Sequence, residues 1–76
     1  MQFDYSKLLG RMRECGYTQE KLAQVIGISK SSLNLKLKNK ANFYHPEMKK
    51  ICEALNITGE DVEAVFFTLK VEKSST

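Results

Sequence analysis

Three residues divide the middle of the 76-residue sequence into two short helices joined by a tight turn. Thr18 and Ser29 each carry a hydroxyl that can accept a hydrogen bond from a backbone N–H in the first turn of a following helix. Gly27 stands just before the second of these caps, and glycine ends a helix readily because it adopts the left-handed conformation without strain. The spacing therefore predicts a helix from Thr18 to Gly27, a turn, and a second helix that starts at Ser29.

Each of these two helices has one apolar face. The residues that the first helix is expected to bury are Leu22, Ala23, Val25 and Ile26, and those of the second are Leu33 and Leu37. The opposite face of the second helix is centred on Leu35, and its other side chains are small, polar or basic: Lys30, Ser31, Ser32, Asn34 and Lys38. No acidic residue lies between Lys30 and Lys40, so nothing in this segment repels phosphate.

Three further helices are expected around this pair. The first runs from Asp4 to Cys15, with Asp4 as its N-cap. A fourth has Pro46 in its first turn, where the missing N–H costs nothing, and ends at Asn56. A fifth starts at Thr58 and turns its apolar side chains inward: Val62, Val65 and Phe66. We therefore expect a compact all-α fold of four or five helices.

The end of the sequence has the period of a strand. Phe67, Leu69 and Val71 alternate with polar residues, which predicts a short C-terminal strand. A lone strand leaves its backbone groups unpaired, so we expect it to pair with its copy in a homodimer. The alternative is that Phe66 and Phe67 only close the core.

Length and composition argue against several classes of protein. A chain of 76 residues forms one small domain, and its apolar runs are too short to span a bilayer. Its first residues lack the basic and apolar regions of a signal peptide, so we expect a cytoplasmic protein. Cys15 and Cys52 form no CxxC pair, and His45 is the only histidine. We expect two buried structural thiols, no metal, no cofactor, no small-molecule substrate and no enzymatic activity.

The charge is distributed unevenly. Residues 1–17 carry a net charge of +1, residues 18–50 carry +5 and residues 51–76 carry −3, which together give +3. The middle segment contains seven lysines and two glutamates. A basic middle and an acidic end suit a protein with one surface that faces a polyanion, although solvated lysines give the same pattern.

The stretch from Thr18 to Leu33 resembles the helix-turn-helix of the phage-repressor family, the lambda-repressor and Cro-like proteins. The resemblance rests on a glutamine, an alanine, a glycine and a serine at the family's spacing: Gln19, Ala23, Gly27 and Ser29. It covers about residues 4–66. It implies a lambda-repressor-like domain whose motif spans about residues 18–38 and inserts the second helix of the motif into the major groove.

Carried over by position, the resemblance implies that Gln19 contacts a phosphate and that Lys30, Ser31 and Leu35 reach the bases. Lys30 can donate to guanine or contact phosphate only; Asn34 can pair with adenine or remain solvated. Leu35 can pack on a thymine methyl, on a neighbouring helix or on a partner subunit. Phosphate contacts are expected from the residues after the helix. The predicted DNA-binding residues are Gln19, Lys30, Ser31, Ser32, Asn34, Leu35, Lys38, Lys40 and Asn42.

Two residues depart from the family's pattern. Lys36 stands where many members have an apolar residue, and Leu37 is expected to take the core role. Asn39 replaces the common glycine after the recognition helix, and asparagine also tolerates the left-handed conformation.

We therefore predict a transcriptional regulator, a repressor or Cro-like protein of phage or prophage type, that binds double-stranded operator DNA as a homodimer. Residues 1–67 form its DNA-binding domain, and residues 68–76 form a C-terminal tail that includes the dimerising strand. The alternative is a protein-binding module on the same fold, such as an antirepressor or an antitoxin-like partner. The lysines of the middle segment favour the first function.

Overall fold

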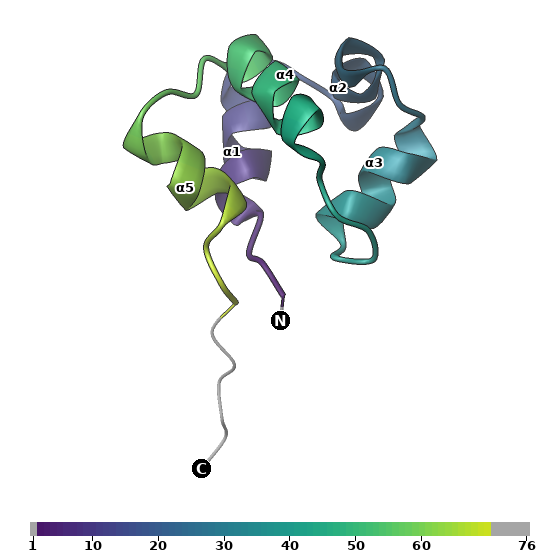
Figure 1. Cartoon of the computed structure of the whole chain (residues 1–76). Helices are drawn as coiled ribbons and strands as arrows, with labels where there is room; N and C mark the ends of the chain where they lie inside the picture. Colours follow the sequence, from purple (N-terminus) through teal and green to yellow (C-terminus); the bar gives the residue numbers. More distant parts are fainter. Residues whose placement is uncertain (1, 71–76) are drawn as a thin grey trace.

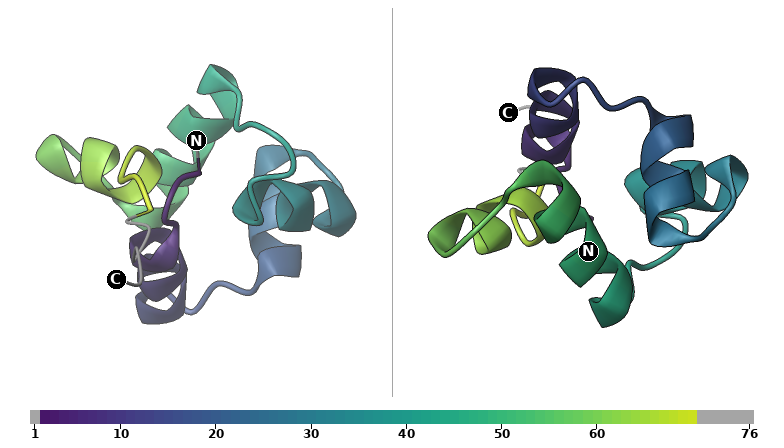
Figure 2. Two further views of the ribbon diagram at one scale, coloured as in Figure 1. Left: turned by 90° about the horizontal axis from the view of Figure 1, so that it is seen from below. Right: turned by 90° about the horizontal axis from the view of Figure 1, so that it is seen from above.

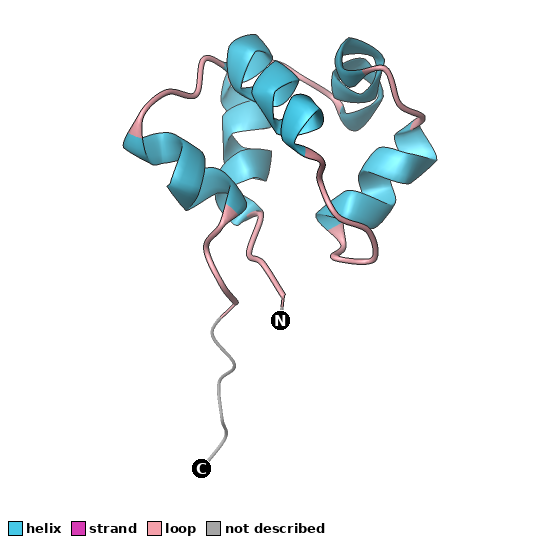
Figure 3. Cartoon of the chain, in the orientation of Figure 1, coloured by secondary structure: helices cyan, strands magenta, loops and turns pink. Residues whose placement is uncertain are grey.

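The computed structural model describes residues 2–70 and places five helices in them (Figure 1): α1 (Ser6–Glu14), α2 (Gln19–Ile26), α3 (Lys30–Leu37), α4 (His45–Leu55) and α5 (Glu60–Phe66). The regular secondary structure of this part of the chain is helical, apart from one isolated bridge between two extended residues (Figure 3). The predicted all-α fold of four or five helices is confirmed. None of the described helices is long and apolar enough to cross a membrane.

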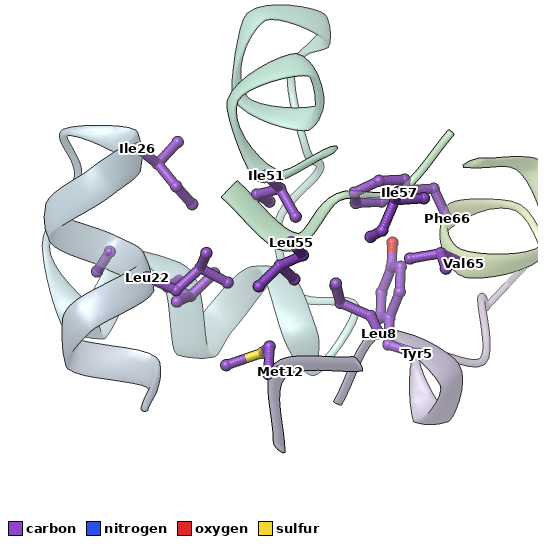
Figure 4. Packing of buried hydrophobic residues seen from close by; sticks show 12 residues of the cluster. Tyr5, Leu8, Met12, Leu22, Ile26, Ile51, Leu55, Ile57, Val65 and Phe66 are labelled. Carbon is purple, nitrogen blue, oxygen red and sulfur yellow. The ribbon is translucent and has the colours of Figure 1, made fainter. Parts of the chain in front are cut away.

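The helices form two pairs linked by α4. Helix α2 packs on α3 and α4, whereas α1 packs on α5. Figures 1 and 2 accordingly show α2 and α3 together on one side of the molecule, and α1 and α5 on the other. All five helices contribute to one core (Figure 4), whose most deeply buried side chains are Leu8, Leu22, Leu33, Ile51, Leu55 and Phe66. Leu33 anchors α3 in this core, which leaves the opposite face of α3 in solvent.

Local hydrogen bonds define the ends of α2 and α3 as the sequence predicts. The Thr18 hydroxyl accepts the N–H of Lys21 at 3.1 Å, and the Ser29 hydroxyl accepts the N–H of Ser32 at 3.0 Å. Gly27 ends α2 with a φ of 85°, in the left-handed region. The helix, turn and helix expected between Thr18 and Leu37 are therefore present.

Two predicted helix starts are wrong. Helix α1 begins at Ser6, two residues after the predicted cap, although the Asp4 carboxylate still accepts the Ser6 N–H at 2.9 Å. Helix α5 begins at Glu60, and its N-cap is Gly59, with a φ of 59°. Thr58 contributes its backbone carbonyl to the Asp61 N–H at 3.2 Å. The glycine turn therefore delays the helix by a residue.

Some predicted core residues are wrong as well. Val25 is 42% exposed, because the buried face of α2 is formed by Leu22, Ala23 and Ile26. Cys15 lies just past the end of α1 and is exposed, while Cys52 is half-buried, and both are free thiols. The expected pair of buried structural thiols is therefore not found.

The C-terminal segment has a partner within its own chain. Leu69 forms an antiparallel bridge with Phe3; the Asp4 N–H donates to the Thr68 carbonyl at 2.6 Å, and the Lys70 N–H donates to the Gln2 carbonyl at 2.9 Å. The premise of a lone, unpaired strand is therefore wrong for residues 68–70. The predicted strand also included Val71, which lies outside the described residues.

Candidate nucleic-acid interface

Helix α3 presents a polar face to solvent at the end of the molecule occupied by α2 and α3 (Figure 1). Lys30, Ser31 and Leu35 are exposed on it, and Asn34 is half-buried. These four side chains line one shallow hollow. Leu35, at 45% exposure, is its apolar member. The structure thus brings together the predicted base-reading residues in the first two turns of α3.

Gln19 and Asn34 meet across the two helices of the motif. Gln19 is the first residue of α2, and its Oε1 accepts a hydrogen bond from Asn34 Nδ2 at 3.4 Å. This contact orients the Asn34 amide within the hollow. Ser32, by contrast, belongs to the start of the helix, because its hydroxyl accepts a hydrogen bond from the Ser29 hydroxyl at 2.9 Å.

The remaining predicted residues lie at the other end of α3. The chain leaves the helix through a Schellman turn, in which the Lys40 N–H donates to the Leu35 carbonyl at 2.9 Å and the Asn39 N–H donates to the Lys36 carbonyl at 3.1 Å. Asn39 has a φ of 63° in this turn. Lys38, Lys40 and Asn42 are positioned around it, on the solvent side of the turn. They form a second cluster in the sequence and do not line the hollow.

Sequence reasoning missed the role of Lys36. Its side chain is buried, with 7% exposure, and its Nζ lies 2.7 Å from Glu47 Oε1. The same ammonium donates to the Asn42 carbonyl at 3.0 Å and lies 4.5 Å from the centroid of the Tyr44 ring. Leu37, predicted to take the core role, is only half-buried. The signal that could have found Lys36 is its three-residue spacing from Leu33, which places it on the buried face.

The electrostatics of Glu47 reflect this contact. Burial by itself raises the pKa of Glu47, but hydrogen bonds from the Lys36 ammonium and from the Tyr44 N–H outweigh that effect, so the pKa of Glu47 is lowered. The carboxylate is therefore ionised at neutral pH. The pair joins the last turn of α3 to the first turn of α4.

Not all lysines of the basic segment are free to bind a partner. Lys36 is used in the ion pair, and Lys50 donates to the Ile26 carbonyl at the end of α2 at 3.4 Å. Lys30, Lys38 and Lys40 lie on and just after α3, and their side chains form no ion pair or hydrogen bond with residues 2–70. No acidic residue lies between Lys21 and Pro46, so α3 and the turn after it carry lysines and no acidic side chain.

The His, Cys, Asp and Glu side chains of residues 2–70 form no group of three or more that could hold a metal ion.

Comparisons with known proteins give two findings. The sequence model of the family described as "Protein of unknown function (DUF739)" matches residues 1–69. The solution structure of the modulator of repression (MOR) of the temperate bacteriophage TP901-1 from Lactococcus lactis is similar to this chain, with 35% sequence identity and a TM-score of 0.73. The similarity covers 93% of this chain and 96% of the other. A search of curated proteins gives no match.

Proposed function

We propose that this chain, which belongs to the family described as "Protein of unknown function (DUF739)", is a small phage or prophage regulator that binds double-stranded operator DNA through α2 and α3. The observation that carries the proposal is the solvent-facing side of α3, which combines small polar side chains with lysines and has no acid nearby in the sequence. A helix with such a face fits the major groove, which is about 12 Å wide.

The two clusters, one on α3 and one just after it, suit two kinds of contact. In the hollow, Lys30, Ser31, Asn34 and Leu35 reach base edges, and the Gln19 contact holds the Asn34 amide in place. Ser32, engaged in the helix cap, stays at the edge of this set. Around the Schellman turn, Lys38, Lys40 and Asn42 contact the phosphate backbone. The first cluster gives selectivity, and the second gives affinity.

The similarity to a phage protein supports the regulatory part of the proposal. The related protein is described as a modulator of repression of a temperate phage, and it shares the fold of this chain over nearly its whole length. A role in controlling phage gene expression is therefore the function class that we propose for this chain.

A homodimer forms the other part of the proposal. A palindromic operator presents two half-sites about 34 Å apart, which two copies of α3 would read together. Phe67 and Leu69 are 49% and 47% exposed, and they supply an apolar surface for a second copy. Because residues 68–70 already pair with residues 2–4, the second copy would use the outer edge of this segment.

A protein-binding module is the second candidate, and one observation favours it. Leu35 stands exposed in the middle of the polar face of α3, where an apolar side chain of a partner protein could cover it. A protein named a modulator of repression can act on a repressor as well as on an operator.

Selection from random duplexes distinguishes the two candidates. The chain is incubated with a library of random double-stranded DNA, the bound fraction is sequenced over several rounds, and the enriched duplex is titrated against a shuffled one by fluorescence anisotropy. DNA reading predicts enrichment of one motif and at least about a thousandfold preference over the shuffled duplex. If no motif is enriched and arbitrary duplexes all bind equally weakly, the DNA-binding proposal fails and the protein-binding candidate replaces it.

A further inference from the structure

The Asn39 side chain binds both backbone groups of Phe3. The Phe3 N–H donates to Asn39 Oδ1 at 2.7 Å, and Asn39 Nδ2 donates to the Phe3 carbonyl at 2.9 Å. The two residues are 36 positions apart in sequence. A carboxamide has the donor and the acceptor of a peptide group, so Asn39 pairs with Phe3 as a neighbouring strand would.

The other edge of the same segment pairs with the C-terminal segment. Asp4 and Gln2 supply the N–H and the carbonyl that bind Thr68 and Lys70. Residues 2–4 are therefore held from two sides, by Asn39 on one and by residues 68–70 on the other. We call this arrangement the Phe3 clasp. It ties the end of α3 to segments that adjoin α1 and α5.

The turn that carries Asn39 also carries the proposed phosphate contacts. Lys38 and Lys40 flank Asn39 in the Schellman turn. A glycine at this position would satisfy the φ of 63° at least as well as asparagine. What asparagine adds is the pair of hydrogen bonds to Phe3. These bonds fix the position of the turn relative to the opposite half of the domain.

We propose that Asn39 is a positioning residue for DNA binding: through the Phe3 clasp, its side chain holds Lys38 and Lys40 where they meet the phosphate backbone. This inference rests on the proposed DNA-binding function. Loss of the clasp weakens binding, because the two lysines then have to be ordered when DNA binds. It also flattens the salt dependence, because a lysine that no longer reaches its phosphate no longer releases a counterion.

The chain contains a matched control. Asn56 also has a left-handed conformation, with a φ of 56°, at the end of α4. It is exposed, and its contacts are made by its backbone, with an N–H that donates to Cys52 and a carbonyl that accepts from Arg11. Asn39→Gly and Asn56→Gly are therefore the same substitution at two residues with a similar positive φ, one with the clasp and one without it.

The test compares both variants with the wild-type chain at a temperature where circular dichroism shows all three folded. Asn39→Gly is expected to lower the affinity for the selected duplex by about three- to tenfold, to flatten the salt dependence and to speed hydrogen exchange of the Phe3 amide. Asn56→Gly is expected to keep affinity within about twofold, since surface changes away from special contacts have small effects.

Two results would overturn the positioning role while leaving the proposed function intact. One is equal affinity of the two variants together with faster exchange at Phe3, which would make the clasp a purely structural feature. The other is unchanged exchange at Phe3 in Asn39→Gly. Absence of salt-dependent DNA binding by the wild-type chain would instead remove the proposed function, and the positioning role with it.

Discussion

Replacing Glu47 with glutamine removes the negative charge that faces the Lys36 ammonium and keeps the shape of the side chain. The two side chains are only 7% and 14% exposed, so the remaining positive charge would stay largely out of water. Breaking a buried pair by removing one partner costs about 3–5 kcal/mol of unfolding free energy. Because the oxygen of the new carboxamide can still accept hydrogen bonds, we expect a smaller loss, about 2–3 kcal/mol.

This loss is large for a chain of this size. A domain of 76 residues has an unfolding free energy of about 4–11 kcal/mol. A change of about 2–3 kcal/mol should lower the melting temperature of Glu47→Gln by about 10–20 °C. The double variant Lys36→Met/Glu47→Gln no longer buries an unpaired charge, so it should recover part of that loss.

The assay is urea and thermal unfolding of wild type, Glu47→Gln, Lys36→Met and the double variant, followed by circular dichroism. Folding lowers the pKa of Glu47 below its value in the unfolded chain, which is about 4.3. The contribution of the pair to the unfolding free energy is therefore fully present above that pH, and it is lost as the pH falls through the lower pKa of the folded chain. The gap between wild type and Glu47→Gln should therefore shrink in acid. A Glu47→Gln variant within about 0.5 kcal/mol of wild type at neutral pH would refute the reasoning.

Three further predictions concern the motif and its surroundings. Gly27→Val should lower the melting temperature by about 5–15 °C, because a β-branched residue is strained at a φ of 85°. Gly10→Ala inside α1 should leave the melting temperature equal or higher. A Gly27→Val variant that melts at the wild-type temperature would show that the turn of the motif is not at Gly27. Asn34→Ala should cost about 1–3 kcal/mol at one base position, and Lys38→Ala should weaken binding to all duplexes alike; a uniform loss in Asn34→Ala would remove its base-reading role. Deleting residues 68–76 should shift the sedimenting species from dimer to monomer, and an undiminished dimer would show that this segment is not the interface.

The parts of the fold that could be predicted are those governed by neighbours in sequence. Thr18 and Ser29 cap their helices because a hydroxyl and the N–H it binds are three residues apart. Gly27 and Asn56 end helices because of their own backbone preferences. The solvent-facing side of α3 follows from helical periodicity, since Leu33 on the opposite side is the buried anchor.

The parts that could not be predicted depend on partners far apart in the chain. Helical spacing from Leu33 places Lys36 on the buried face of α3, but the partners of its ammonium, Glu47 and the Asn42 carbonyl, are set by the fold and not by that spacing. The pairing of Leu69 with Phe3 joins the two ends of the described chain, and no local pattern indicates it. The sequence predicts only that Asn39 permits a turn, because its second role depends on where residue 3 lies.

The measurement that tests the central claim most directly is the salt dependence of binding to the selected duplex. Affinity is measured between about 50 and 200 mM salt for wild type, for Lys38→Ala/Lys40→Ala and for the control Lys7→Ala/Arg13→Ala, whose two exposed cations lie on α1. The account predicts a steep loss of wild-type affinity with salt, a slope shallower by about two units in the first variant, and an unchanged slope in the control. Equal slopes for the two double variants, or wild-type binding that does not respond to salt, would contradict it.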